Sequence, residues 1–297
     1  MKKVVLLVTL GGPRTSGEIP DFIKRFTGKE LPPQVMRAII ERYKLIGGYS
    51  PLCEITEKQS QLLQSELGDK YICLPAFRYA FPSISDSIDM ALNSEADEIL
   101  FFILSPFYTS VTTGNYINVA KEYLENLKLN VNLKFIHSWY KNENFISAWC
   151  NKIREETDNK DSFYIFSAHS LPEKFLNEPY KNQIVELTET IAKNLNLKNY
   201  KLGWQSIPSM AKEKWIEPTV ENIIDEVKSL GFDEIIQVPI GFTADHIETL
   251  YDIDICHKEY AEKLNLKFKR ISSLNTYPLF IKALADIVKS SQGEVNG

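Results

Sequence analysis

Short apolar runs recur along the chain, separated by segments with helical spacing. Most runs have four to seven residues and are rich in β-branched side chains, which is typical of strands buried on both faces of a parallel sheet. The predicted strands are Val4–Val8, Tyr71–Phe77, Ile99–Leu104, Leu133–Ile136, Phe163–Phe166, Lys201–Trp204, Ile235–Ile240 and Leu266–Ile271.

The segments between these runs repeat apolar residues every three or four positions, as amphipathic helices do. The clearest predicted helices are Ser83–Asn93, Tyr116–Leu127, Gln183–Leu195 and Pro218–Leu230. The regular alternation of strand and helix indicates an α/β fold with parallel sheets and helices on both faces.

Eight strands can form one wide sheet, but two four-stranded units are the favoured organisation. We expect an N-terminal unit at residues 1–137 and a C-terminal unit at 138–277. The polar, helical segment Ser138–Lys160 would carry the chain from one unit to the other, and the helix Pro278–Ser290 would pack back on the first.

The two halves also resemble each other. In both Ile99–Thr109 and Ile235–Thr243, an apolar strand leads into a loop with small, aromatic and hydroxyl residues. This is a weak internal repeat, and a cleft between the halves would be the expected ligand site.

Composition excludes several classes of protein. The net charge of −5 lacks the basic balance of a general nucleic-acid binder. The four cysteines are far apart and form no C-x-x-C pair, which excludes a zinc knuckle or a cysteine-only iron–sulfur site and fits a reducing cytoplasm. The apolar start of the chain is interpreted as a first strand rather than a signal peptide, and no apolar stretch approaches the ~20 residues of a membrane span.

His169 lies where a predicted strand gives way to a loop, the place where α/β folds put their chemistry. Ser167 and Ser170 flank it and no lysine is adjacent, so its ring can stay neutral near pH 7 and accept a proton. The alternative is a histidine that is simply hydrogen-bonded in a strand-end turn.

A second histidine, His246, follows another predicted strand. If a helix begins there, Glu248 and Asp252 lie four residues apart on one face, with Cys256 at the next step and His257 after it. Two carboxylates on one stripe can hold a cation or pass protons, although a solvated acidic face is the alternative.

Glycine-rich loops at Gly11–Pro13 and Ile46–Pro51 lack the Walker pattern and favour a close-packed floor under a flat ligand over a phosphate site. The segment Ser110–Asn115 predicts a helix start whose free N–H groups could meet an anion, with an ordinary N-cap as the alternative. Aromatic residues also gather at the predicted strand ends and would suit a large, planar, apolar ligand.

The chain resembles the ferrochelatases, which insert ferrous iron into a porphyrin to make haem. The resemblance covers essentially the whole chain. It rests on Leu10-Gly11-Gly12-Pro13, Ile46–Pro51, Phe77-Arg78-Tyr79, Thr112-Thr113-Gly114, Phe166–Pro172, Trp204-Gln205-Ser206 and Phe242–Tyr251. It implies two Rossmann-like units, each a four-stranded parallel sheet flanked by helices, around a porphyrin cleft.

The resemblance implies a role for each matching residue. His169 and Glu248 would be catalytic and bind the metal, Asp245 and His246 would be the catalytic pair that tunes Glu248, and Asp252 would be a further member of the metal row. The implied substrate-binding residues are Leu10, Ser50, Arg78, Tyr79, Thr113 and Trp204.

The chain departs from the family pattern in three respects. Cys256 stands where the acidic row often continues, so Cys256 and His257 would supply softer ligands. Leu45 and Glu57 replace residues that hold a propionate in several members, which leaves Lys44 or Arg42 for that task. Leu10 favours protoporphyrin IX as the substrate, whereas residues 55–59 resemble the branch that acts on coproporphyrin III.

The implied partners are a porphyrin and ferrous iron as substrates, with no nucleic acid. No tightly bound cofactor is expected, and no iron–sulfur cluster, because no cysteine follows Cys256. A cytoplasmic location is expected. Residues 22–40 resemble the lip of the substrate pocket, which in some relatives also touches the membrane. A peripheral contact with the inner face of the membrane is therefore left open. The alternatives are a coproporphyrin III ferrochelatase, a cobalt or nickel chelatase, a porphyrin or haem carrier without turnover, and a two-domain glycosyltransferase.

Overall fold

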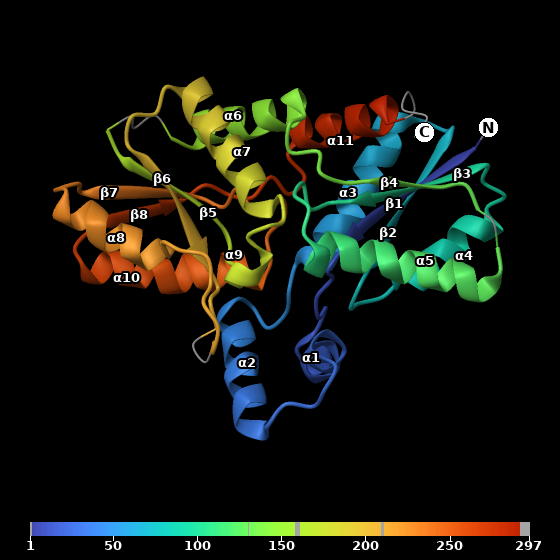
Figure 1. Cartoon of the computed structure of the whole chain (residues 1–297), viewed down its shortest axis with the longest axis horizontal. Helices are drawn as coiled ribbons and strands as arrows, with labels where there is room; N and C mark the ends of the chain where they lie inside the picture. The colour runs from blue at the N-terminus through green and yellow to red at the C-terminus, as the bar shows by residue number, and fades with distance from the viewer. Residues whose placement is uncertain (1, 130, 158–160, 209–210, 292–297) are drawn as a thin grey trace. The chain divides into compact units, whose positions relative to one another are not determined.

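The structure, a computed structural model, describes residues 2–129, 131–157, 161–208 and 211–291. It divides into two compact units: unit 1, which runs to Asn144 and resumes at Thr276, and unit 2, Phe145–Asn275 (Figure 1). Each unit holds a four-stranded parallel sheet flanked by helices, so the predicted fold class is confirmed.

In unit 1 the strands are ordered β2-β1-β3-β4. Their bounds are β1 Lys3–Thr9, β2 Tyr71–Phe77, β3 Glu98–Ile103 and β4 Leu133–Ile136. The helices of this unit are α1 (Ile19–Thr27), α2 (Pro33–Leu45), α3 (Leu52–Leu67), α4 (Ile84–Asn93), α5 (Asn115–Leu127) and α11 (Pro278–Ser290), with a π-helical turn at Ser110–Gly114 before α5.

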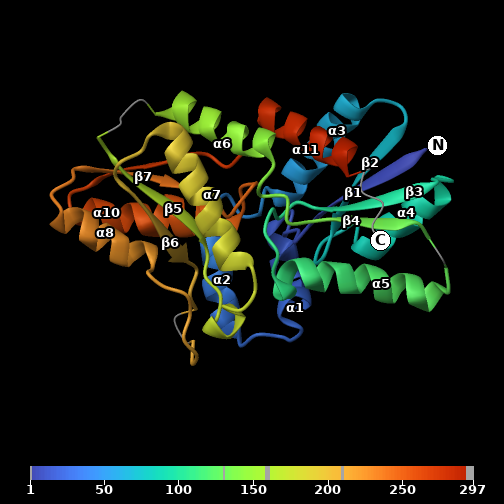
Figure 2. The same ribbon diagram turned by 45° about the horizontal axis from the view of Figure 1, so that its top comes forward.

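The core of unit 1 lies on both sides of β1, whose residues Val4–Val8 are all fully buried. Helices α4 and α5 cover one face of the sheet, and α3 with α11 covers the other (Figures 1 and 2). Burial on both faces explains why the strand sequence is continuously apolar rather than alternating. Helices α1 and α2 stand apart from the sheet (Figure 1).

Unit 2 repeats this plan with the strand order β6-β5-β7-β8. Its strands are β5 Phe163–His169, β6 Tyr200–Gln205, β7 Glu234–Val238 and β8 Lys267–Arg270. Its helices are α6 (Glu143–Glu156), α7 (Tyr180–Leu195), α8 (Val220–Ser229), α9 (Ile247–Leu250) and α10 (Lys258–Lys263), with a π-helix at Asp252–His257 between the last two.

The weak repeat in the sequence has a structural counterpart. Strands β3 and β7, which carry the two similar segments, both occupy the third place in their sheets. Equivalent loops therefore leave the carboxyl edge of each sheet at equivalent positions.

The division between the units falls seven residues later than the expected boundary at 137/138. Trp139 stays with unit 1 because its ring packs on Phe102 and Phe280 and its indole nitrogen donates to the carbonyl of Ile103 at 2.9 Å. The helix expected over Ser138–Lys160 is shorter, Glu143–Glu156, and residues 158–160 lie outside the described part of the chain.

None of the described helices combines the length and apolar character needed to cross a membrane.

Candidate active site

His169 is the last residue of β5, at the carboxyl edge of the unit 2 sheet. Its Nδ1 lies against the carbonyl oxygen of Ser170. Because a carbonyl oxygen can only accept, Nδ1 is the donor of this contact, and the neutral form of the ring has its lone pair on Nε2. Nε2 lies 3.6 Å from Oε1 of Glu248. The structure thus joins the two residues that the sequence singled out.

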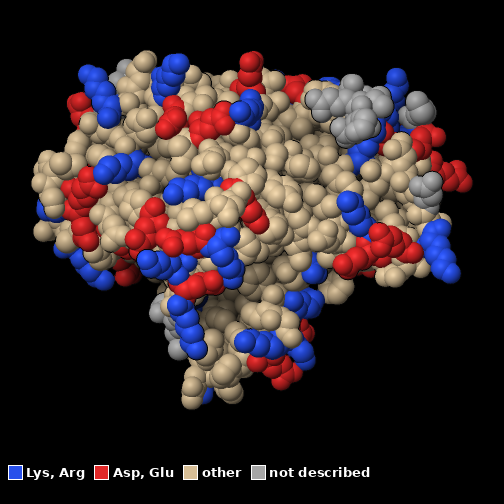
Figure 3. All heavy atoms as spheres, in the orientation of Figure 1, with Lys and Arg blue, Asp and Glu red and all other residues tan. Residues whose placement is uncertain are grey.

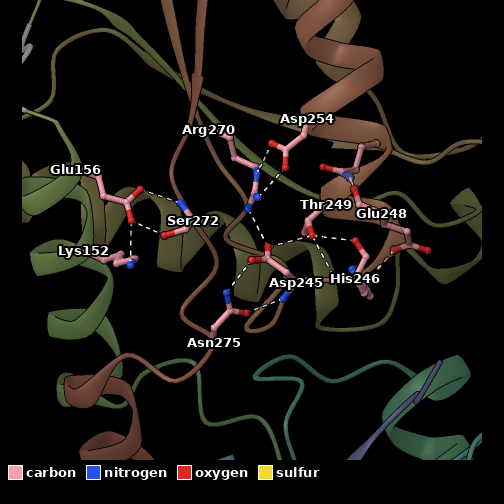
Figure 4. A network of polar contacts seen from close by, with 11 residues as sticks. Lys152, Glu156, Asp245, His246, Glu248, Thr249, Asp254, Arg270, Ser272 and Asn275 are labelled. Atoms are coloured by element: carbon pink, nitrogen blue, oxygen red, sulfur yellow. Dashed lines mark hydrogen bonds and ion pairs between the residues drawn. The ribbon is translucent and has the colours of Figure 1, made fainter. Parts of the chain in front are cut away.

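Glu248 lies in the first turn of α9, beside His246. Its other oxygen, Oε2, is 3.7 Å from Nε2 of His246 (Figure 4). Burial lowers the pKa of His246, and the nearby carboxylates of Glu248 and Asp245 only partly oppose this effect. His246 is therefore neutral near pH 7 and leaves the charge of Glu248 uncompensated.

The spacing of these groups suits a shared cation better than a direct hydrogen bond. A first-row divalent ion held at about 2.1 Å from a nitrogen and an oxygen keeps them about 3.0–3.6 Å apart at angles of about 90–120°. The side chains of His169 and Glu248 are 32% and 30% exposed, so a cation can reach both. The described residues contain no group of three or more histidine, cysteine, aspartate or glutamate side chains arranged to hold a metal.

Residues that the sequence reasoning missed support this pair. Tyr180, at the start of α7, donates its hydroxyl to the carbonyl of His169 at 3.0 Å, and burial raises its pKa. The ring of Trp215 lies 6.4 Å from that of His169. Gln205 donates to the carbonyl of Glu248 at 2.9 Å. Trp215 carried a signal in the sequence as one of the aromatics gathered at strand ends, and Gln205 as part of Trp204-Gln205-Ser206, whereas Tyr180 carried none.

Asp245 lies inside a network of donors (Figure 4). Its Oδ1 accepts from Nη1 of Arg270 at 2.8 Å and from the hydroxyl of Thr249 at 3.1 Å, and its Oδ2 accepts from Nδ2 of Asn275 at 2.7 Å. Burial alone would raise the pKa of Asp245, but the charge of Arg270 and these hydrogen bonds outweigh it and hold the pKa below its usual range. Asp245 therefore stays ionised, and its oxygens are committed to the protein.

The predicted metal row does not run along one α-helical face. Helix α9 ends at Leu250 and a π-helix follows, in which the N–H of Cys256 reaches the carbonyl of Tyr251, five residues back. Asp252 accepts from the hydroxyl of Ser206. His257 is buried and its Nδ1 contacts Oε1 of Gln237 at 3.1 Å, whereas Cys256 is exposed. The two side chains thus differ in exposure, and their role as softer ligands stays a prediction.

In unit 1, Leu10, Arg78 and Tyr79 gather at the carboxyl edge of the sheet. The backbone N–H groups of Arg78 and Tyr79 each donate at 3.0 Å, to the carbonyls of Thr9 and Leu10. The guanidinium of Arg78 lies 4.7 Å from the centre of the Tyr79 ring, and its Nε donates to Asn115 at 2.7 Å. The contact of these residues with a substrate stays a prediction.

Ser50, Thr113 and Trp204 are buried. Thr113 donates to the carbonyl of Phe107 at 3.0 Å, and Trp204 packs against the ring of Tyr180. Trp204 thus packs beside a residue that contacts His169, whereas Ser50 and Thr113 are buried within unit 1; direct contact of these three with a substrate stays a prediction.

The glycine-rich loops Gly11–Pro13 and Ile46–Pro51 pack on each other. Their place under a flat ligand stays a prediction. The N–H of Ser50 donates to the carbonyl of Pro13 at 2.9 Å. A Cβ at Gly12 would lie 2.6 Å from Cβ of Ser50, so only glycine fits there.

Glu57 is not an isolated acid. It accepts from Nη2 of Arg14, which also donates to the carbonyl of Phe81. Lys44, expected as a propionate partner, pairs with Glu41 on the exposed side of α2. The cation next to position 57 is therefore Arg14, which the sequence analysis did not consider.

Solved structures identify the class of fold. SirB from Bacillus subtilis with Fe3+ matches with a TM-score of 0.64 at 12% identity, covering 100% of this chain and 99% of that one. The sirohydrochlorin chelatase SirB from Bacillus subtilis subspecies spizizenii in complex with cobalt matches with a TM-score of 0.61 at 11% identity, over 98% and 95%. The chain has a chelatase-type fold.

Sequence comparisons then identify the family. The family model described as Ferrochelatase matches residues 2–292. A ferrochelatase from Geotalea daltonii is 33% identical over 99% of both chains, and a coproporphyrin III ferrochelatase from Oceanobacillus iheyensis is 32% identical over 99% of both. The chain belongs to the ferrochelatase family and is an enzyme of porphyrin metallation.

Proposed function

We propose that this ferrochelatase inserts ferrous iron into protoporphyrin IX through His169 and Glu248. The observation that supports this most directly is the position of Nε2 of His169, which faces a carboxylate oxygen of Glu248 at 3.6 Å while Nδ1 contacts the carbonyl of Ser170. A neutral imidazole and a carboxylate are both proton acceptors and both ligands for a borderline metal ion.

The chemistry requires both properties. Free-base porphyrin carries protons on two of its pyrrole nitrogens, and both protons must leave before the dication can bind all four nitrogens. Nε2 of His169 accepts one proton and becomes an imidazolium, and a Glu248 oxygen accepts the other. The products are the neutral iron porphyrin and two protons, which return to solvent through these partly exposed side chains.

Asp245 and His246 take supporting roles in this proposal. Asp245 is ionised and fully hydrogen-bonded, so it positions the segment rather than accepting a pyrrole proton. The buried, neutral His246 fixes the second oxygen of Glu248 without cancelling its charge. Asp252 would hold incoming iron before transfer.

The choice of protoporphyrin over coproporphyrin III rests on Leu10, an apolar side chain at the edge of the unit 1 sheet. Coproporphyrin III is the second candidate, because it carries more propionates and Arg14 places a guanidinium beside Glu57. Relatives of similar identity carry both names.

We further propose that the enzyme needs no tightly bound cofactor and no iron–sulfur cluster, and that it acts in the cytoplasm. Exposed Phe26 and Val35, next to basic Arg25 and Arg37, support a peripheral membrane contact through residues 22–40. Co-sedimentation with anionic vesicles, compared with Phe26→Ser, tests that contact.

The central experiment follows metallation anaerobically by absorbance, with ferrous iron or zinc and with either porphyrin. We expect His169→Ala and Glu248→Gln to lower kcat by about 10²–10⁴-fold while porphyrin binding persists. Glu213→Gln is the matched control, since this acid of unit 2 is exposed and pairs with the exposed Lys174 rather than with a site residue. Near-normal turnover in either site variant contradicts the proposed roles, and tight porphyrin binding without turnover by the unaltered protein identifies a carrier.

A further inference from the structure

Arg270, the last residue of β8, bridges two acids that lie nine positions apart. Its Nε and Nη2 donate to the two oxygens of Asp254 at 2.6 and 2.8 Å, and its Nη1 donates to Asp245 at 2.8 Å. Figure 4 shows Arg270 between the two acids. The side chain of Arg270 is only 11% exposed. All three nitrogens of one buried guanidinium are thus engaged by carboxylates.

The segment between these two acids, residues 246–253, carries His246, Glu248 and Asp252. It has little regular secondary structure to hold it, because α9 has only four residues and gives way to a π-helix. Arg270 binds the acid at each end of this segment, Asp245 and Asp254. Asn275 reinforces one end, since it accepts from the N–H of Asp245 at 2.8 Å and donates to its carboxylate.

We propose that Arg270 is a positioning residue for the reaction: it fixes both ends of the segment 245–254 and so sets the distance between Glu248 and His169. This inference rests on the proposed function. A movement of either end would displace Glu248 from Nε2 of His169, where the present separation of 3.6 Å suits a shared cation.

These contacts with Asp254 and Asp245 depend on the shape of the guanidinium as well as on its charge. Lysine keeps the charge but has a single ammonium group, which cannot engage both oxygens of Asp254 and also reach Asp245. The informative variants are therefore Arg270→Lys, which keeps the charge, and Asp254→Asn, which weakens one end and leaves the contact between Arg270 and Asp245 in place.

The experiment measures kcat and KM for protoporphyrin, the affinity for Co2+ alone from its visible absorption, and the melting temperature. Arg154→Lys is the matched control, because Arg154 is an exposed arginine of α6 in the same unit. For both Arg270→Lys and Asp254→Asn we expect kcat and Co2+ affinity to fall by about 10–100-fold, with KM for the porphyrin unchanged.

A lower melting temperature with wild-type kcat and Co2+ affinity would show that Arg270 only stabilises the fold, and would overturn the proposal. If Arg270→Lys fails to fold, Asp254→Asn alone tests the proposal. Asp254 is more exposed than Arg270, so its replacement disturbs the fold less. Glu248→Gln separates the two proposals. If it is inactive while Arg270→Lys and Asp254→Asn are fully active, only this inference fails; if it is active, the proposed function fails first.

Discussion

The pairing of Asp245 with Asn275 makes a prediction that can be worked out atom by atom. The Oδ2 atom of Asp245 accepts from Nδ2 of Asn275, and the Oδ1 atom of Asn275 accepts from the N–H of Asp245. In Asp245→Asn, the remaining oxygen would face Arg270 and Thr249, so the new NH2 group would face the NH2 group of Asn275. Two donors would then oppose each other at a buried site.

The cost has two parts. A buried donor left without an acceptor costs about 1–3 kcal/mol, and replacing a charged acceptor of Arg270 by a neutral one removes about another 1 kcal/mol. We therefore expect Asp245→Asn to lower the free energy of unfolding by about 2–4 kcal/mol. The double variant Asp245→Asn/Asn275→Asp restores donor to acceptor at this contact and should recover about 1–3 kcal/mol.

Urea unfolding of the wild type, both single variants and the double variant gives these differences, provided that the slope of the transition is the same for all four. Glu213→Gln again serves as the control for removing a carboxylate from unit 2. If the double variant is no more stable than Asp245→Asn alone, the donor–acceptor reasoning is refuted.

Three further predictions follow from the same contacts. The pKa of Asp245 is lower in the folded than in the unfolded chain, so its charge stabilises the fold fully above the unfolded pKa of about 3.9. This stability is lost as the pH falls through the folded pKa. From neutral to acid pH, the urea midpoint of the wild type should therefore fall more steeply than that of Asp245→Asn. Gly241→Ala would place a Cβ 2.7 Å from the Cα and Cβ of Ala168 and should cost about 1–3 kcal/mol of unfolding free energy, whereas Gly17→Ala, whose nearest neighbour is at 3.9 Å, should cost far less. Cys256 is exposed, whereas burial raises the pKa of Cys53 to about 11, so a thiol reagent should modify Cys256 first and Cys256→Ser should abolish the fast phase.

Much of the fold follows from the sequence because strands buried on both faces must be continuously apolar. Val4–Val8 shows that pattern, and Ile235–Ile240 shows it except at Gln237, whose buried amide donates to the hydroxyl of Ser167. The unit boundary was less predictable, because Trp139 belongs to unit 1 through contacts with a helix that begins at Pro278. No local pattern signals such a distant contact.

The site shows the same limit. His169 and Glu248 stood out because both follow predicted buried strands, where α/β folds put their chemistry, and because the family resemblance implies a role for each. Arg270 and Asn275 lie 25 and 30 residues from Asp245 and look like ordinary polar positions in the sequence, although they fix its carboxylate. The spacing of Glu248, Asp252 and Cys256 predicted an α-helical row, but spacing alone does not distinguish an α-helix from a π-helix.

The two units share one topology, but the proposed catalytic residues all lie in unit 2. Strands β1 and β5 both hold the second place in their sheets, but β5 ends at His169 whereas β1 ends at Thr9 and continues into Leu10. The third strands lead to Phe107 and Tyr108 in unit 1 and to the segment 241–248, with its acids and histidine, in unit 2. The same two strand ends thus carry apolar and aromatic residues in unit 1 and the proposed proton acceptors in unit 2. The proposed reaction requires both a hold on a flat apolar ring and the removal of its protons, and strand ends at equivalent places in the two sheets carry residues suited to each of these tasks.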